Sequence, residues 1–286
     1  MLNAWQDLVI RKADPADQQG LIHLLERKSF IHRHLGWDSP LAWLEKDPFY
    51  ILESEQGIVA ALACPPDEDH ITWLRLFAVR PGFEVEEAWK NLWPVVNSWM
   101  KDHFPGVLIN SLVMNNKMER ILSRAGFKEA YQVVVLVWDI THAIWPESKS
   151  DLEVREMLPE DFQRVYEIDL SAFSLIWRNS MSQQLAAYQE AFSATVIEED
   201  GKVVAYQVST TNPQGGHLAR LAVDPEYQKQ GYATRLMVDL LETFQEQGII
   251  EVTVNTQSDN KASLDLYQKF GFHMLEETYP VLQCKV

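Results

Sequence analysis

One turn in this sequence has the residue types needed to bind a phosphate group. An apolar run ends at Pro225, which lacks the N–H donor that a continuing strand requires. A helix is then expected to run to about Glu246. Gly231 and Ala233 lie where this helix begins, and their small side chains leave backbone N–H groups uncovered. Because the first N–H groups of a helix lack internal partners and carry partial positive charge, a pyrophosphate fits there.

Two further features bear on this turn. Lys229 adds a point charge to it. The helix is expected to pack one face on a sheet, because its apolar residues recur at helical spacing. These residues are Leu236, Met237, Leu240, Leu241 and Phe244. Taken alone, the segment is equally typical of an ordinary strand-to-helix turn with a glycine at the helix start.

The spacing within the turn identifies a family. Gln228-x-x-Gly231-x-Ala233, after a strand ending in Leu-Ala-Val-Asp-Pro, resembles the acetyl-CoA signature of the GNAT superfamily of N-acetyltransferases. Residues 260–272 resemble the family's next helix and its closing Gly-Phe. The two segments follow one another in the family's order, and the resemblance covers roughly residues 150–286.

The resemblance implies a set of residues that bind acetyl-CoA as co-substrate. In this family the strand before the signature splays from its neighbour, and the pantetheine arm lies in the gap and hydrogen-bonds to backbone. The turn after it holds the pyrophosphate on its amides. In this sequence the implied residues are Leu221, Ala222, Val223, Gln228, Lys229, Gln230, Gly231, Tyr232, Ala233, Thr234 and Asn260.

Tyr267 occupies the position where many members of the family place a tyrosine near the thioester sulfur. The implied role is to protonate the departing thiolate. A free thiol titrates near 8.5 and a tyrosine near 10, so full transfer is uphill by about 2 kcal/mol. Hydrogen bonding to the developing thiolate is therefore expected to matter more than complete protonation. The alternative for Tyr267 is a helix aromatic packed on the sheet.

The general base and the residues that bind the acceptor amine have weaker sequence signals than the acetyl-CoA turn. His217 lies at the start of the signature strand, where ribosomal-protein alanine acetyltransferases of this family carry a glutamate, and an imidazole suits a general base. An ordinary surface histidine is the alternative, and Glu167 and Asp169 are weaker candidates for the base. Trp177 and Arg178 lie where the family usually builds its acceptor-binding wall, although Trp177 suits a core position equally well.

The sequence also contains a diverged internal repeat. At an offset of 144 to 145, residues 76–81 match residues 220–225, and Asn115 matches Asn260. Ala125-Gly126-Phe127 likewise matches Phe270-Gly271-Phe272. Matches that keep their order and spacing indicate a duplicated domain.

We therefore expect two domains, residues 1–143 and 144–286, joined by a linker over residues 141–151. The alternation of short strands and helices favours an α/β (α+β) fold. The resemblance implies that each domain is GNAT-like, with a mixed, largely antiparallel, twisted sheet flanked by helices.

The N-terminal half has lost the residues of the turn. In the ungapped alignment Gln228, Gly231 and Ala233 correspond to Glu84, Glu87 and Trp89. Carboxylates at a helix start would repel a pyrophosphate, and Trp89 is expected to fill its space. Tyr267 corresponds to Leu122. The first domain is thus expected to be degenerate, with one acetyl-CoA site per chain.

Composition narrows the partners. The net charge of −16 over 286 residues disfavours nucleic acid and favours a cationic acceptor, although it also serves solubility. No apolar run is long enough for a membrane span, the first residues do not read as a secretory signal, and the two cysteines lie far apart. We expect a cytoplasmic N-acetyltransferase that needs no metal and acts on a small-molecule or peptide amine. A non-catalytic acyl-CoA sensor remains the alternative, and the oligomeric state is open.

Overall fold

The protein divides into two compact units in a computed structural model that describes residues 5, 7–27, 29–67, 72–147 and 152–286. Unit 1 comprises Met1–Ala130 and Pro280–Val286, and unit 2 comprises Tyr131–Tyr279. The end of the expected linker, residues 148–151, lies outside the described residues. No helix in the described part is both long and apolar enough to cross a membrane.

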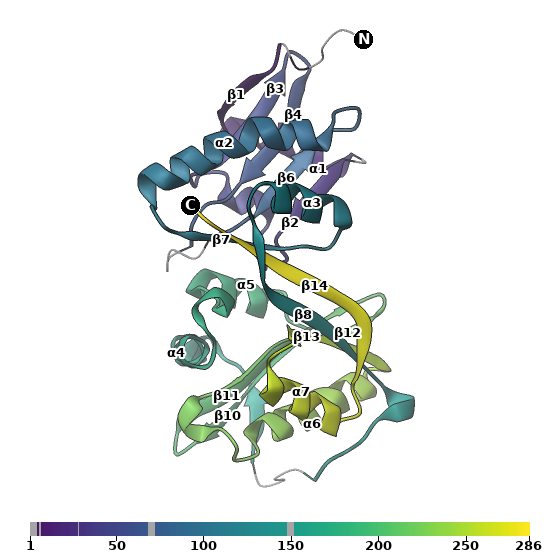
Figure 1. Cartoon of the computed structure of the whole chain (residues 1–286). Coiled ribbons are helices and arrows are strands. Elements are labelled where there is room, and N and C mark those ends of the chain that lie inside the picture. The colour runs from purple at the N-terminus through teal and green to yellow at the C-terminus, as the bar shows by residue number, and fades with distance from the viewer. Residues whose placement is uncertain (1–4, 6, 28, 68–71, 148–151) are drawn as a thin grey trace. The chain divides into compact units, whose positions relative to one another are not determined.

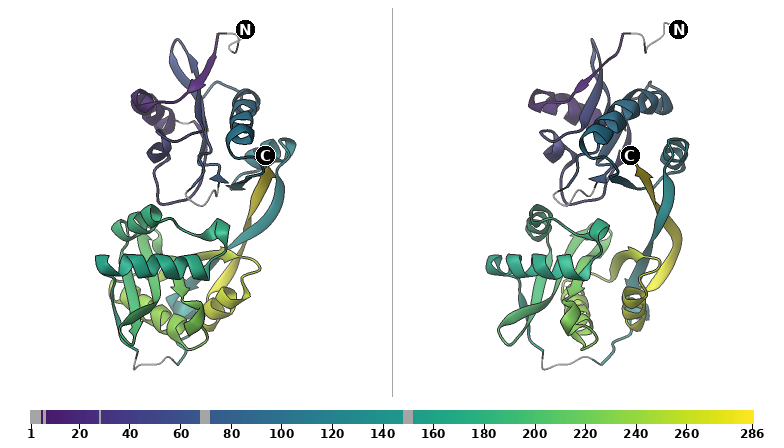
Figure 2. Two further views of the ribbon diagram at one scale, coloured as in Figure 1. Left: turned by 90° about the vertical axis from the view of Figure 1, so that its left-hand side faces the viewer. Right: turned by 60° about the vertical axis from the view of Figure 1, so that its left-hand side comes forward.

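Unit 1 is a sheet with helices on both faces (Figures 1 and 2). Its elements are β1 (Val9–Lys12), α1 (Gln18–Glu26), β2 (Phe30–Arg33), β3 (Phe49–Ser54), β4 (Gly57–Ala63), β5 (Thr72–Trp73), β6 (Leu76–Val79), α2 (Val85–His103), β7 (Leu108–Leu112) and α3 (Asn116–Arg124). Five strands form an antiparallel sheet in the order β1-β3-β4-β6-β2. Alternate residues of β4 point to opposite faces, so Ala61 packs towards α1 while Leu62 packs towards α2.

Unit 2 has the same layered plan. Its elements are β8 (Lys128–Asp139), β9 (Val154–Glu156), α4 (Phe162–Ala172), α5 (Met181–Gln189), β10 (Ser193–Glu199), β11 (Lys202–Asn212), β12 (Gly215–Val223), α6 (Tyr232–Glu246), β13 (Glu251–Gln257), α7 (Lys261–Lys269) and β14 (His273–Lys285). The strand order is β14-β8-β13-β12-β11-β10-β9. The expected α/β fold with largely antiparallel sheets is confirmed, and β12 and β13 form a parallel pair beside the candidate site.

A repeated ion-pair motif supports the duplication. In unit 1, Arg11 binds Asp17 and Glu53 at 2.6 and 2.8 Å. In unit 2, an arginine 144 positions later makes the same two contacts, since Arg155 binds Asp161 at 2.7 Å and Glu198 at 3.0 Å. The ion pairs with Asp17 and Asp161 tie β1 to the turn that starts α1 and β9 to the turn that starts α4. These residues lie outside the segments that match between the two halves of the sequence.

The two units exchange chain segments, so they do not coincide with the expected domains 1–143 and 144–286. Residues 131–143 belong to unit 2, because β8 pairs with β13 from Val133 to Asp139. The last seven residues belong to unit 1, where the end of β14 pairs with β7. The expected boundary at residues 143 and 144 marks where the sequence repeat starts again. The units differ from it because β8 and the end of β14 each pair with strands of the other half of the sequence.

Candidate functional site

The two parallel strands of unit 2 separate partway along their length. β12 pairs with β13 only at Gly216, His217 and Leu218, opposite Val252 to Val254. Beyond Leu218, β12 keeps its antiparallel partner β11 as far as Val223. β13 continues along β8 as far as Gln257. The edge of β12 that faces β13 is therefore free over residues 219–223, as a splayed pair of strands requires.

A β-bulge marks the point of separation. Val208 of β11 is opposite Arg220, but the next residue, Ser209, is opposite Leu218, so Ala219 is an extra residue in β12. Bulges re-aim side chains and free backbone groups. Of the predicted strand residues, Leu221 is half-buried, while Ala222 and Val223 are buried against β11 and the helices. Backbone groups alternate between the two edges of a strand, so those of Leu221 and Val223 face the open edge, whereas those of Ala222 face Tyr206 of β11.

The turn after β12 leads into the start of α6, as expected. Gly231 is the N-cap of α6, with φ of 101°, and no side chain caps the helix. Lys229 also has a positive φ, 61°. Left-handed residues just before a helix form a concave array of N–H groups that suits an anion. The first turn of α6 thus offers unpaired donors at its positive end.

The remaining residues predicted in the turn differ in their surroundings. Gln228 donates its amide to the carbonyl of Val223 at 3.2 Å, which holds the turn against the strand. Gln230 and Lys229 are exposed, and Ala233 and Thr234 are half-buried. Tyr232 is buried in the core beside α6, so it contributes its backbone alone to the turn surface.

Tyr267 lies in the core between α7 and the sheet. Its side chain packs with Leu218 and Val254, the last paired residues before the strands separate, and its ring is 5.5 Å from that of Phe272. Burial raises the pKa of Tyr267 to about 12, against the effect of a hydrogen bond with Ser263. The residue therefore keeps its proton throughout the physiological range. Tyr267 is therefore a packed core aromatic with a hydroxyl that can donate, and its role towards the thiolate stays a prediction.

His217 is half-buried on β12 and interacts with the neighbouring strand. Its Nδ1 lies 2.8 Å from Oγ1 of Thr253, and that hydroxyl donates to the carbonyl of Gly216 at 3.3 Å. Because a hydroxyl has one hydrogen, this arrangement requires Nδ1 of His217 to donate, which leaves a lone pair on Nε2. Burial lowers the pKa of His217, so the imidazole is neutral near pH 7.

His217 and Tyr267 lie on opposite faces of the sheet. Leu218 packs against α6, so its neighbour His217 points to the other face. Arg220, beyond the bulge, reaches that same face and contacts α4. A group placed at the open edge of β12 thus has the candidate base on one side and the candidate proton donor on the other.

The expected acceptor wall lies on the face of α4 and α5. Trp177 ends a short 3-10 helix (Leu175–Trp177) and is half-buried, with its ring 5.8 Å from that of Tyr131. Arg178 is half-buried and donates its Nε to the carbonyl of Phe173 at 3.1 Å. Both residues lie in the segment between α4 and α5, as expected.

The two weaker candidates for the base have other roles. Asp169 is fully buried, and its carboxylate accepts hydrogen bonds from Arg220, Tyr206 and the backbone of Asn179. It has no exposed lone pair for an amine, so the suggestion that it is a base is wrong. Glu167 is exposed on α4 and lies 3.4 Å from Arg164.

Asn260 is the N-cap of α7. Its side chain accepts from the backbone of Ser263 at 3.3 Å and donates to Thr256 at 3.0 Å. Its counterpart Asn115 caps α3 in unit 1 in the same way, accepting from Met118 at 2.8 Å. A cap present in both units accounts for Asn260 without a ligand, and its contact with the cofactor stays a prediction.

The corresponding turn in unit 1 is shorter, which corrects the ungapped comparison. Four residues, 80–83, separate β6 from the N-cap of α2, whereas seven, 224–230, separate β12 from the N-cap of α6. Gly231 therefore corresponds to Glu84, and Trp89 corresponds to Leu236. Trp89 does not fill the phosphate space, because it is buried in the core and stacks on Trp93 at 5.1 Å. The electrostatic argument remains, since Glu86 and Glu87 occupy the first turn of α2.

The edge that is open in unit 2 is covered in unit 1. Strand β2 pairs with β6 from Phe30–Val79 to Arg33–Leu76, and His34 donates its backbone N–H to the carbonyl of Arg75 at 3.2 Å. His32 of β2 also reaches Ser111 of β7 at 2.8 Å. The segment after the first helix of unit 1 thus fills the gap between β6 and β7. In unit 2 the corresponding residues, 173–192, form a 3-10 helix and α5 instead.

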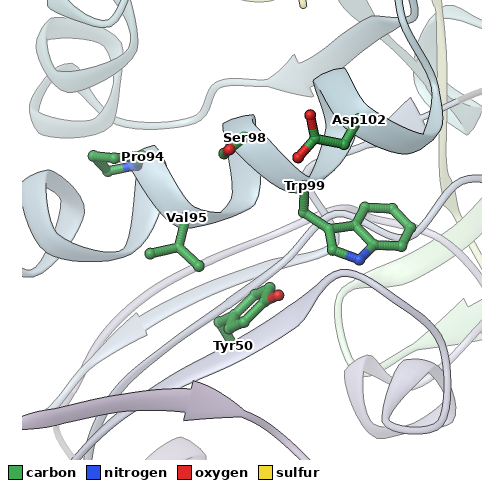
Figure 3. Close-up of a pocket in the computed structure, with 6 residues that line it drawn as sticks. All are labelled: Tyr50, Pro94, Val95, Ser98, Trp99 and Asp102. Carbon is green, nitrogen blue, oxygen red and sulfur yellow. The ribbon is translucent and has the colours of Figure 1, made fainter.

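A separate shallow cavity of about 460 Å³ lies in unit 1, between α2 and β3 (Figure 3). Tyr50 of β3 faces Val95 and Trp99 of the helix across it, and the polar groups come from Ser98 and Asp102. These residues belong to the middle and end of α2, far along the helix from its N-terminal turn. The cavity therefore does not correspond to the site in unit 2.

Comparison with known proteins agrees with the location of this site. The model of the acetyltransferase (GNAT) family matches residues 162–272. The [ribosomal protein bS18]-alanine N-acetyltransferase of Haemophilus ducreyi is 28% identical over 124 residues, which are 43% of this chain and 83% of that protein. N-alpha-acetyltransferase 30 of Schizosaccharomyces pombe is 32% identical over 92 residues, 31% of this chain and 61% of that protein.

Two solved structures share the fold of nearly the whole chain. A tandem GNAT protein from the clavulanic acid biosynthesis pathway has a TM-score of 0.68 at 15% identity, covering 97% of this chain and 98% of that one. A GCN5-related N-acetyltransferase from Sphaerobacter thermophilus has a TM-score of 0.64 at 15% identity, covering 98% and 96%. Residues 162–272, in unit 2, are thus similar to the acetyltransferase (GNAT) family.

Proposed function

We propose that unit 2 transfers an acetyl group from acetyl-CoA to a primary amine by direct attack in a ternary complex. The open edge of β12, which begins at the bulge of Ala219 and runs into the uncapped start of α6, is the observation that carries the proposal. The pantetheine amides would pair with that edge as an added strand, and the pyrophosphate would sit on the N–H groups around Gly231.

Proton removal from the amine and stabilisation of the leaving thiolate would take place on opposite faces of the sheet. The amine would approach on the face of His217, whose Nε2 has a free lone pair to receive its proton. The thiolate would leave towards Tyr267, which donates a hydrogen bond from the other face. This arrangement needs no covalent acyl-enzyme, because the attacking and leaving groups each have their own partner.

The neutral imidazole favours a weakly basic amine. An α-amine titrates near 8, whereas a lysine side chain titrates near 10.4 and would be about 3 kcal/mol harder to deprotonate. A buried histidine with a lowered pKa suits the first kind better. The relatives are named for acetylating an alanine of a ribosomal protein or a protein α-amine. We infer that the acceptor is a peptide N-terminus or a small amine of similar basicity.

The proposal is tested by calorimetry with acetyl-CoA on the wild type, Gly231→Glu and Gly248→Glu. Gly248 ends the same helix, also has a positive φ (75°), and has open space around its Cβ position, so it is a matched control for backbone strain. A carboxylate about 4 Å from the pyrophosphate costs roughly 4 kcal/mol at an effective dielectric constant near 20. We expect one site per chain, lost in the first variant and kept in the control.

Turnover is then measured with three acceptors: an alanine-initiated peptide, glucosamine and an α-blocked lysine. Faster acetylation of the first two would agree with the proposal, and preference for lysine would contradict the assignment of acceptor class. Acetyl-CoA binding without acetylation of any amine would favour a sensor. Unchanged binding in Gly231→Glu would exclude the turn as the phosphate site.

A further inference from the structure

A buried ionic cluster joins three elements around the proposed acceptor site. Asp169 of α4 is fully buried, and its Oδ2 accepts from Nε of Arg220 at 2.7 Å and from the hydroxyl of Tyr206 at 2.6 Å. Its Oδ1 accepts from the backbone N–H of Asn179 at 2.9 Å. Such a carboxylate needs hydrogen-bond donors, and here it has three of them, on different parts of the chain.

Arg220, the partner of Asp169, also contacts the segment between α4 and α5. Its terminal nitrogen donates to the carbonyl of Trp177 at 2.7 Å, and its guanidinium lies 3.5 Å from the ring centre of Phe173. The segment 173–180, which bears Trp177 and Arg178, is therefore held at both ends of its turn by one ion pair. The fork of an arginine allows this, since it donates in two directions from one rigid plane.

The position of Arg220 links this segment to the acyl donor. It directly follows the bulged residue Ala219, at the start of the free edge of β12. Any shift of the segment relative to Arg220 is a shift of the acceptor wall relative to the thioester. Acyl transfer is sensitive to such shifts, since a misplacement of about 1 Å can cost about 100-fold in rate.

We propose that Asp169 and Arg220 are positioning residues that fix the acceptor-binding segment 173–180 against the strand that holds the acyl donor. The inference rests on the proposed function. It assigns to this pair the placement of the amine, and it gives neither residue a role in proton transfer.

The test uses three variants, two of which each remove one hydrogen bond to Asp169. Asn179→Pro removes the donor that lies on the segment. Arg178 has φ −72° and ψ 147°, which suits the residue before a proline. Tyr206→Phe removes a donor that lies on β11 and leaves the segment tied, so it is the control. Arg220→Lys keeps a charge beside Asp169 but replaces the fork with a single donor group.

Kinetics are measured with the best of the three acceptors, together with the Kd for acetyl-CoA. We expect Asn179→Pro and Arg220→Lys to raise the acceptor KM by about 10-fold or more, with the acetyl-CoA Kd unchanged. Tyr206→Phe should leave the Kd unchanged and should raise the acceptor KM much less, because Arg220 and the backbone of Asn179 still hold Asp169. Equal effects of Asn179→Pro and Tyr206→Phe on KM, or an unchanged acceptor KM in Arg220→Lys, would overturn the inference. Failure of the wild type to bind and use acetyl-CoA would instead refute the proposed function.

Discussion

Replacement of Tyr267 by phenylalanine separates two ways in which this residue can assist the leaving thiolate. With the pKa of Tyr267 at about 12 and a thiol near 8.5, complete proton transfer is uphill by about 5 kcal/mol. That exceeds the value of about 2 kcal/mol expected for an unperturbed tyrosine. Burial has thus made Tyr267 a poorer acid while keeping it a hydrogen-bond donor.

The expected loss follows from the value of one charge-assisted hydrogen bond. Such a bond contributes about 1.5–3 kcal/mol, so Tyr267→Phe should lower kcat by about 10- to 150-fold. Binding of acetyl-CoA should change little, because the thioester of the ground state carries no negative charge. The thermal midpoint should also stay close to that of the wild type, since the ring and its packing in the core are retained.

The assay follows release of the free thiol at saturating acetyl-CoA and acceptor, with the Kd measured by calorimetry. Tyr206→Phe is again the matched control, because it removes a buried hydroxyl from the other face of the same sheet. An unchanged kcat would refute a role for the Tyr267 hydroxyl. A loss beyond 1000-fold (about 4 kcal/mol) would refute the hydrogen-bond argument and point to full proton transfer.

Two further predictions concern His217 and unit 1. Protonation of His217 should reduce kcat in the wild type, and because the pKa of His217 is lowered, this fall should occur at a pH below 6.5. His217→Gln should lose most of the rate, and its kcat should no longer show this fall at acidic pH. A persistent fall in the variant would exclude His217 as the base. In unit 1, a triple variant replaces Glu84, Glu86 and Glu87 with the residues at the same positions of the unit 2 turn. Calorimetry should still find one acetyl-CoA per chain, because β2 covers the strand edge that the pantetheine needs. A second equivalent would show that the carboxylates alone blocked the site. The substitutions are Glu84→Gly, Glu86→Ala and Glu87→Thr.

The sequence predicts the elements of the site well because their signals are local. Pro225 ends a strand, Gly231 begins a helix, and the apolar spacing of α6 shows which face is buried. These features depend on neighbours within a few residues, so they can be recognised without the fold.

The turn before α2 is three residues shorter than the turn before α6, and an alignment without gaps does not reveal this difference. Trp89 was matched to Ala233 because the alignment had no gap, and no single residue marks the loss of three positions. The helix start reveals it, since Glu84 and Gly231 are both N-caps. A correct assignment of Trp89 requires knowledge of which face of α2 meets the sheet.

Other features depend on partners far along the chain. Asp169 was a plausible base by position, but its partners Tyr206 and Arg220 lie 37 and 51 residues away, and they consume its lone pairs. The covering of β6 by β2 likewise depends on strand pairing between segments with no shared motif. Burial and pairing of this kind are decided by the tertiary fold, so composition and spacing do not predict them.

The exchange of strands between the units has a consequence for folding during synthesis. The edge of β7 in unit 1 is paired by Val281 to Lys285, and β13 of unit 2 is paired by β8, which is made before the rest of that unit. As the chain leaves the ribosome, unit 1 keeps an unpaired strand edge until nearly all of unit 2 has emerged. Such an edge invites pairing with other nascent chains. A cut between residues 143 and 144 would make that exposure permanent in the first fragment and would remove a central strand from the second.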